Sequence, residues 1–155
     1  MGFTSPSLKG RALRLLGQRE HSRDELRRKL ARHVQDGDDL DAVLDDLQAK
    51  NFISEDRVVE STVHQRADRF GAARIRQALQ AKGIAPALVQ QAVASLHDTE
   101  FERAYALWAR RFVALPDDAK ERARQGRFLL TRGFSGDVVH RILRGDVPDD
   151  RAAPP

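Results

Sequence analysis

The sequence predicts an all-α protein built from three tandem three-helix repeats, which together form an elongated, slightly curved, solenoid-like chain. One observation is that two apolar positions four residues apart recur about every 50 residues, at Leu26 and Leu30, at Ile75 and Leu79, and imperfectly at Gln125 and Leu129. A period of this length is typical of one supersecondary unit stacked on its copies. A second observation is the lack of sustained alternation between apolar and polar residues, which β-strands would show.

The first repeat is predicted at residues 8–53, after a flexible N-terminus at 1–7. Its helices are expected at 8–18, 22–33 and 39–50. Ser22 and Glu25 have the spacing of a capping box, which satisfies free backbone N–H groups at a helix start. The residues expected to form the core of this repeat are Leu13, Leu16, Leu26 and Leu30.

The second repeat is predicted at residues 54–97. Its helices are expected at 54–69, 72–82 and 86–96. Ser54 precedes two acidic residues, which favour the positive end of a helix dipole, and Pro86 suits a first helical turn. The tripeptide Lys82-Gly83-Ile84 predicts a helix end, because the glycine can adopt a left-handed conformation and the apolar residue can fold back. The expected core residues are Val59, Val63, Ile75 and Leu79.

The third repeat is predicted at residues 98–146, followed by a flexible tail at 147–155. Its helices are expected at 98–112, 117–132 and 135–144. Thr99 and Glu102 offer a second capping box. The tripeptide Arg132-Gly133-Phe134 repeats the earlier helix end 50 residues later. The helical spacing of Tyr105, Trp108 and Phe112 fits a core stripe better than a platform for stacking bases.

Composition limits the class of protein. The chain has 155 residues, of which 41% are apolar, enough for one domain or a short solenoid. It has no cysteine, so it can form neither a disulfide framework nor a thiolate site. The first residues lack the charged and then apolar run of a secretory signal, and no apolar stretch is long enough to span a bilayer. We therefore expect a soluble, cytoplasmic monomer that does not bind membranes.

Charge is unevenly distributed along the first repeat. Residues 1–32 hold nine Lys or Arg against three Asp or Glu, whereas residues 33–50 hold one lysine against six aspartates. The acidic run does not have the order of a calcium-binding loop and lacks its closing glutamate. We interpret it as a linker that leads into a helix N-terminus, although Asp45 and Asp46 could instead pair with basic groups on a partner.

Basic residues are the candidates for contact with a polyanion or an acidic protein surface. Arg28 and Arg32 are one helical turn apart, as are Arg66 and Arg69, so each pair shares a helix face. The candidate partner-binding residues are Arg27, Arg28, Arg32, Arg66, Arg69, Arg74 and Arg76, with Arg110 and Arg111 as further candidates for nucleic acid. The alternative is that each of these arginines is simply a solvated residue on a helix surface.

No motif for catalysis is present. The glycines are scattered and never form the G-x-x-x-x-G-K-[ST] phosphate-binding loop. The five histidines do not have zinc-ligand spacing, and we expect each of them at the surface or at a helix end. The sequence therefore predicts no catalytic residue, no metal and no cofactor.

Three segments resemble the signature of the RecX family, bacterial regulators of the RecA recombinase. They are Arg-Ile-x-x-x-Leu-x-x-Lys-Gly-Ile at 74–84, Leu-x-x-Arg-Gly-Phe at 129–134, and His21, Ser22, Glu25, Leu26, Lys29 and Leu30 in the first repeat. The resemblance covers about residues 8–144 and so nearly the whole chain. The chain departs from it at Gln125, which replaces an apolar position.

The resemblance implies a modulator that catalyses no reaction. It implies three tandem three-helix repeats lying along the groove of the RecA filament on single-stranded DNA. It also implies damping of ATP hydrolysis, strand exchange and the co-protease response. A second hypothesis is a helical module that binds single-stranded nucleic acid directly and inhibits by competition. The sequence alone leaves both open.

Overall fold

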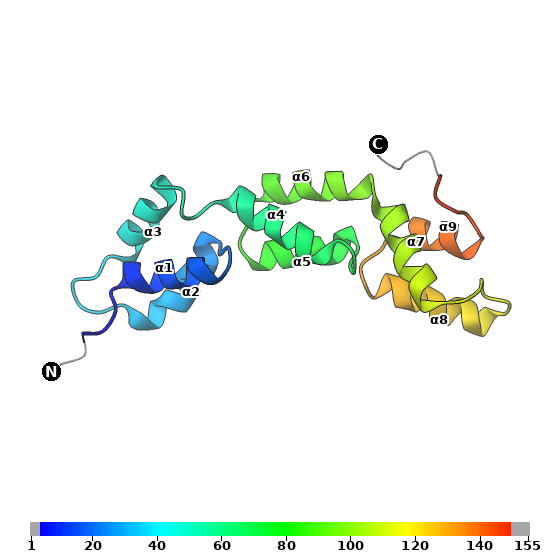
Figure 1. The fold of residues 1–155 in the computed structure, drawn as a ribbon, viewed down its shortest axis with the longest axis horizontal. Helices are drawn as coiled ribbons and strands as arrows, with labels where there is room; N and C mark the ends of the chain where they lie inside the picture. Colours follow the sequence, from blue (N-terminus) through cyan, green and yellow to red (C-terminus); the bar gives the residue numbers. More distant parts are fainter. Residues whose placement is uncertain (1–3, 150–155) are drawn as a thin grey trace.

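The computed structural model describes residues 4–149, and this part of the chain contains nine α-helices, one short 3₁₀ helix and no strand. The helices are α1 (Leu8–Gln18), α2 (Arg23–Leu30), the 3₁₀ helix η1 (Ala31–His33), α3 (Leu40–Ala49), α4 (Glu55–Arg66), α5 (Ala72–Ala81), α6 (Pro86–His97), α7 (Glu100–Arg111), α8 (Ala119–Leu130) and α9 (Gly136–Leu143). They form three groups of three that lie in a row from one end of the molecule to the other (Figure 1). The predicted all-α class is confirmed. Most of the 1–7 segment and the first residues of the 147–155 tail are described, whereas 1–3 and 150–155 lie outside the described residues.

Polar caps explain where most of the helices begin. The capping box at Ser22 is confirmed: its hydroxyl accepts from the Glu25 N–H at 3.1 Å, and the Glu25 carboxylate accepts from the Ser22 N–H at 3.2 Å. Asp39, in the acidic run, caps α3 by accepting from the Ala42 N–H at 3.0 Å. The linker interpretation of this run is therefore confirmed.

The second predicted capping box, at Thr99, is wrong. Thr99 precedes α7 but its side chain caps no N–H group of that helix. Its hydroxyl instead donates to the Leu96 carbonyl at 3.4 Å and accepts from Arg103 Nε at 3.0 Å. The threonine is thus engaged with the end of α6.

Both predicted glycine helix ends are confirmed. Gly83 and Gly133 have φ angles of 72° and 89°, in the left-handed region that favours glycine. The next residue folds back in each case, with the Ile84 N–H donating to Leu79 O at 3.2 Å and the Phe134 N–H donating to Leu129 O at 3.3 Å. Asn51, which is not a glycine, ends α3 in the same way with φ 63°.

Each group of helices encloses its own apolar cluster. The cluster of α1 to α3 contains Leu8, Ala12, Leu26, Leu30, Leu44, Leu47 and Ile53. The cluster of α4 to α6 contains Val58, Ala72, Ile75, Leu79, Ile84, Val89, Val93 and Leu96. The cluster of α7 to α9 contains Phe101, Ala104, Trp108, Phe112, Leu129, Phe134, Val138, Val139, Ile142 and Leu143. Since each helix is too short to be stable alone, this packing is what stabilises it.

The buried faces of α1 and α4 are shifted from the core positions that the sequence predicts. Leu13 is 36% exposed, because α1 turns the face of Leu8 and Ala12 inward. In α4 the fully buried positions are Val58 and Thr62, one residue before the predicted valines, which are only half-buried at the edge of the cluster. The Thr62 hydroxyl is satisfied by donating to the Val58 carbonyl at 2.8 Å, so it fits an apolar position.

Gln125 is buried in the third cluster and compensates for the missing apolar residue there. Its side-chain oxygen accepts from the Trp108 indole N–H at 2.8 Å, and its amide nitrogen donates to the Ala114 carbonyl at 3.1 Å. Trp108 and Phe112 are buried and Tyr105 packs partly buried against them, which confirms the core interpretation of that stripe.

His21 lies at a helix end, directly before the N-cap Ser22 of α2, and it is buried there, with only 1% exposed. Its Nδ1 lies 3.0 Å from the Arg19 carbonyl, so this nitrogen carries the proton, and its Nε2 accepts from Lys29 Nζ at 3.0 Å. Burial lowers the pKa of His21, and the positive charges of Arg19 and Lys29 lower it further.

Candidate partner-binding surface

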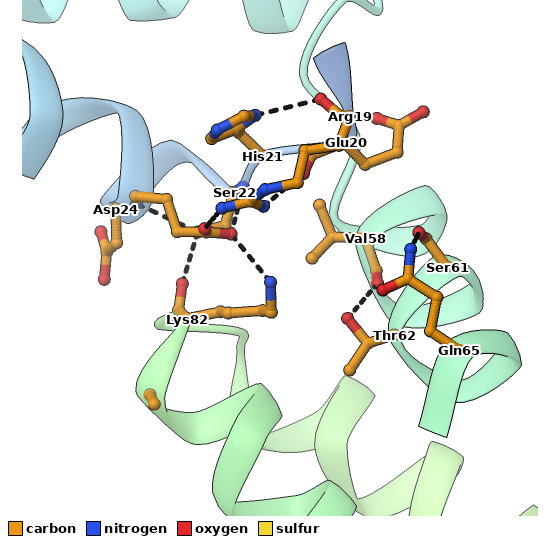
Figure 2. A network of polar contacts seen from close by, with 12 residues as sticks. Arg19, Glu20, His21, Ser22, Asp24, Val58, Ser61, Thr62, Gln65 and Lys82 are labelled. Carbon is orange, nitrogen blue, oxygen red and sulfur yellow. Dashed lines mark hydrogen bonds and ion pairs between the residues drawn. The ribbon is translucent and has the colours of Figure 1, made fainter. Parts of the chain in front are cut away.

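The first and second groups of helices meet end to end, where the start of α2 lies on the end of α5. The Ser22 hydroxyl donates to the Lys82 carbonyl, and Arg28 Nη2 donates to the Ala81 carbonyl at 2.7 Å. Figure 2 shows Lys82 reaching up to the start of α2, with Ser22 and Asp24 above it. A side chain at Gly83 would collide with Asp24, so the contact is close. We call this contact the first joint.

The second joint repeats this arrangement between α5 and α8. The Gly71 N–H donates to the Arg132 carbonyl at 2.8 Å, and Arg74 Nη1 donates to the Thr131 carbonyl at 2.8 Å. A Cβ atom at Gly71 would lie 2.3 Å from the Gly133 carbonyl oxygen, so backbone packs on backbone. At both joints the N-terminus of the middle helix of one group faces the C-terminus of the middle helix of the following group. These pairs are α2 with α5 and α5 with α8. The positive end of one helix dipole therefore meets the negative end of another.

Two arginines on the first helices of the following groups reinforce the joints. Arg57 of α4 donates to the Asn51 carbonyl at 2.7 Å and pairs with Glu20 at 2.9 Å. Arg103 of α7 donates to the Ala67 carbonyl at 2.7 Å and to the Leu96 carbonyl at 3.1 Å. Each arginine satisfies carbonyl groups at the ends of helices in the preceding group.

Acidic side chains complete both joints. Glu25 pairs with Arg19 at 2.7 Å and with Lys82 at 3.3 Å. Burial alone would raise the pKa of Glu25. The hydrogen bonds from Arg19 and Ser22 and the charge of Lys82 outweigh this effect and lower the pKa of Glu25 to about 2. At the second joint, the buried Glu100 carboxylate accepts from the Ala72 N–H at 2.9 Å and so caps α5, whose N-cap residue is a glycine.

A groove lies beside each joint. The first groove has a volume of about 320 Å³ and is lined by Glu25, Arg28, Lys29, Arg66, Ala78, Ala81 and Lys82. The second groove has a volume of about 460 Å³ and is lined by Arg69, Phe70, Arg74, Leu107, Phe128, Thr131 and Arg132. The charged lining residues of both grooves are all cationic except Glu25, and Glu25 is already paired.

Three of the predicted arginines lie around the aromatic ring of Phe70. The guanidinium carbons of Arg66, Arg69 and Arg74 lie 6.0, 5.9 and 5.2 Å from its centroid. In the same groove, the Arg132 guanidinium lies 3.7 Å from the centroid of Phe128. These contacts hold cations over aromatic faces while leaving N–H groups available for a partner.

The structure separates the seven predicted arginines by environment. Arg28, Arg66, Arg69 and Arg74 line the two grooves. Arg27 instead pairs with Asp41 at 2.7 Å, on the side of α2 that faces α3. Arg32 lies in η1, where it lines a separate hollow. Arg76 is exposed on α5.

Sequence reasoning did not select Lys29, Lys82, Arg132 or Phe128 as site residues, although all of them line the grooves. A signal for two of them was present. Lys82 and Arg132 each precede a left-handed glycine 50 residues apart, and such a repeated position marks the same point of successive repeats.

The described part of the chain, residues 4–149, has no helix that is both long and apolar enough to cross a membrane. The acidic run that was a candidate for pairing with a partner is engaged within the first group. Asp45 pairs with Arg23 at 2.7 Å, and Asp46 pairs with Lys9 at 3.2 Å.

Comparison with known proteins matches three successive family models to this architecture. The first three-helix domain of RecX matches residues 9–47, the second matches 54–93 and the third matches 98–143. The "Regulatory protein RecX" of Leptothrix cholodnii is 59% identical over 138 residues, covering 89% of this chain and 88% of that protein. The protein of the same name from Herminiimonas arsenicoxydans is 50% identical over 138 residues, covering 89% and 91% of the two chains.

Solved structures share the fold. The crystal structure of RecX from Lactobacillus salivarius superposes with a TM-score of 0.73 at 23% identity, covering 88% of this chain and 92% of that one. The three matched domains follow the three helix groups in order, and the identity to named relatives extends across all of them. The chain therefore belongs to the RecX family of regulatory proteins.

Proposed function

We propose that this protein is a regulator that binds the RecA recombinase filament on single-stranded DNA and lowers its ATP hydrolysis, strand exchange and co-protease activities. It would act in the cytoplasm as a monomer, in recombination, DNA repair and the SOS response, and would catalyse no reaction itself. Membership of the RecX family and the naming of its relatives as regulatory proteins support this proposal.

The observation that carries the proposal is the repetition of a basic groove at two successive joints. A filament is an extended partner that offers DNA phosphates and acidic protein groups over tens of ångströms. A row of repeats with cationic grooves at intervals has a complementary form, and complementary charge favours association with such a surface. Arg66 and Arg69 are the central candidates, because they line different grooves and their guanidinium carbons lie 6.0 and 5.9 Å from the centroid of the same ring, Phe70.

The test is a titration of this protein into RecA filaments while the rates of DNA-dependent ATP hydrolysis and strand exchange are followed. Single-stranded DNA is held in excess, so that sequestering DNA cannot explain an effect. We expect both rates to fall at well below one copy per recombinase. Unchanged rates at an equimolar ratio with the recombinase of its own organism would refute the regulatory proposal.

A second candidate function is direct binding of single-stranded nucleic acid. The second groove favours it, because Phe70 and Phe128 lie there beside three arginines and aromatic rings can stack on bases. A competitor for DNA should lose affinity steeply as salt rises and should act in proportion to free DNA. Inhibition that disappears when DNA is in excess would favour this second function over filament binding.

A further inference from the structure

A hollow of about 490 Å³ opens in the first helix group, between α1 and the end of α2 with η1. Its lining residues are Pro6, Gly10, Arg11, Arg14, Leu15, Lys29, Leu30, Arg32 and His33. Three guanidinium groups, one ammonium group and an imidazole thus surround a partly apolar floor. None of the lining residues is acidic.

The cations of this hollow are not neutralised by the acidic run of the same group. The aspartates of α3 pair with other basic residues, namely Lys9, Arg23, Arg27 and Lys50. Within residues 4–149, Arg11, Arg14 and Arg32 form no ion pair. Asp38 lines an adjoining hollow of about 200 Å³ that shares Arg11, Arg32 and His33 with this one, and its carboxylate accepts from the Gln35 N–H at 2.9 Å.

The lowered pKa of His33 is consistent with a positive electrostatic potential in this hollow. Desolvation lowers the pKa of its imidazole, and the charges of Arg11 and Arg32 lower it further. Its Nε2 accepts from Arg32 Nε at 3.3 Å, which requires this nitrogen to be unprotonated. A bound anion would offset the repulsion and favour the protonated ring.

We propose that this hollow binds a nucleotide through its phosphate groups, with the sugar or base against the half-buried Leu15. Guanidinium groups match phosphate oxygens with paired hydrogen bonds, and the volume is in the range of small-molecule sites. The hollow shares only Lys29 with the first groove. The proposal stands apart from filament binding, and either one can fail without the other.

The direct test measures binding of the full chain to two probes without added metal: fluorescent ADP and a 5′-phosphorylated oligothymidylate. The first represents a free nucleotide and the second a nucleotide within a strand. We expect at least one probe to bind, and Arg11→Gln with Arg32→Gln to weaken its binding at least tenfold. The matched control, Arg122→Gln with Arg127→Gln on α8 of the third group, should change binding less than twofold.

Failure of both probes to bind, or an equal loss in the control variant, would overturn the proposal. Arg14→Gln alone provides a second variant if the double variant does not fold by circular dichroism. A further readout is the pKa of His33 from nuclear magnetic resonance, which should rise when the probe binds. Binding that leaves the His33 resonance and its pKa unchanged would place the probe elsewhere and would also refute the site.

Discussion

Buried polar side chains make some of the most specific contacts in this protein. His21 bridges the Arg19 carbonyl and the Lys29 ammonium, and Gln125 bridges the Trp108 indole and the Ala114 carbonyl. All buried side-chain N and O atoms in the described part of the chain have a hydrogen-bond partner. Because an unsatisfied buried group costs more than a satisfied one contributes, each of these residues should be sensitive to substitution.

Stability should depend on pH through His21. Its pKa is lowered in the folded state from 6.5, so the unfolded state binds a proton that the folded state does not. The free energy of unfolding should therefore be highest above about pH 6.5 and fall as the pH decreases below that value. Glu25, with a pKa lowered from 4.5 to about 2, contributes stability that is lost only at lower pH, so the two windows are separate.

Urea unfolding between pH 8 and pH 5 measures this dependence. His21→Gln should reduce the loss of stability over that range, and should cost about 1–3 kcal/mol at pH 8 because Lys29 and the Arg19 carbonyl lose a partner. His64→Gln is the matched control, since His64 is exposed on α4. Equal pH slopes for the wild type and His21→Gln would contradict the assignment.

Gln125→Leu should destabilise the third helix group by about 1–3 kcal/mol, because it leaves the Trp108 indole N–H without an acceptor in a buried place. The chain has one tryptophan, so its fluorescence reports this site alone. Gln80→Leu, at an exposed position of α5, is the control and should change stability by less than about 0.5 kcal/mol. A Gln125→Leu variant as stable as the wild type would show that the hydrogen bond contributes nothing.

At the scale of the helices, local sequence signals such as caps and glycines predicted the individual helices. They did not predict how the helix groups contact one another at the two joints. Ser22, Gly83 and Gly133 could be interpreted from a few neighbouring residues, because caps act within one turn. The use of Arg28 and Arg74 as caps of helices in the next group depends on residues over 50 positions away. No local pattern contains that information. Thr99 was misassigned for a different, local reason, because Leu96 and Arg103 compete for its hydroxyl.

Gly71→Ala tests the second joint without backbone strain. Gly71 has φ −80°, which alanine adopts freely, so the cost must come from contact. The added Cβ would lie 2.3 Å from the Gly133 carbonyl oxygen, and we expect a loss of about 1–3 kcal/mol. Chemical denaturation measures it.

Gly17→Ala is the control for this substitution. No atom lies within 4 Å of the added Cβ at Gly17 in α1, so alanine should stabilise the protein by about 0.5–1 kcal/mol. Should Gly71→Ala prove as stable as the wild type, the close approach of α5 to α8 would be incorrect.

At the scale of the whole molecule, three separate clusters in a row imply an elongated shape with little contact between the first and third groups (Figure 1). Small-angle scattering should give a radius of gyration clearly above the ~15 Å expected for a globule of this length. A value near ~15 Å would mean that the row folds back on itself.

In the proposed function, the grooves at the two joints contact the filament. The most direct measurement is filament binding by a triple variant, Arg66→Glu, Arg69→Glu and Arg76→Glu, beside circular dichroism. Arg74 is left intact, because it caps the Thr131 carbonyl and its loss would disturb the second joint. A triple reversal of Lys120, Arg122 and Arg127 on α8 of the third group is the matched control for overall charge.

We expect the Arg66, Arg69 and Arg76 variant to stay folded and to bind RecA filaments more weakly by about 2 kcal/mol or more, with the control much less affected. A well-folded variant that binds and inhibits as strongly as the wild type would contradict the proposal and exclude the middle of the molecule from the interface.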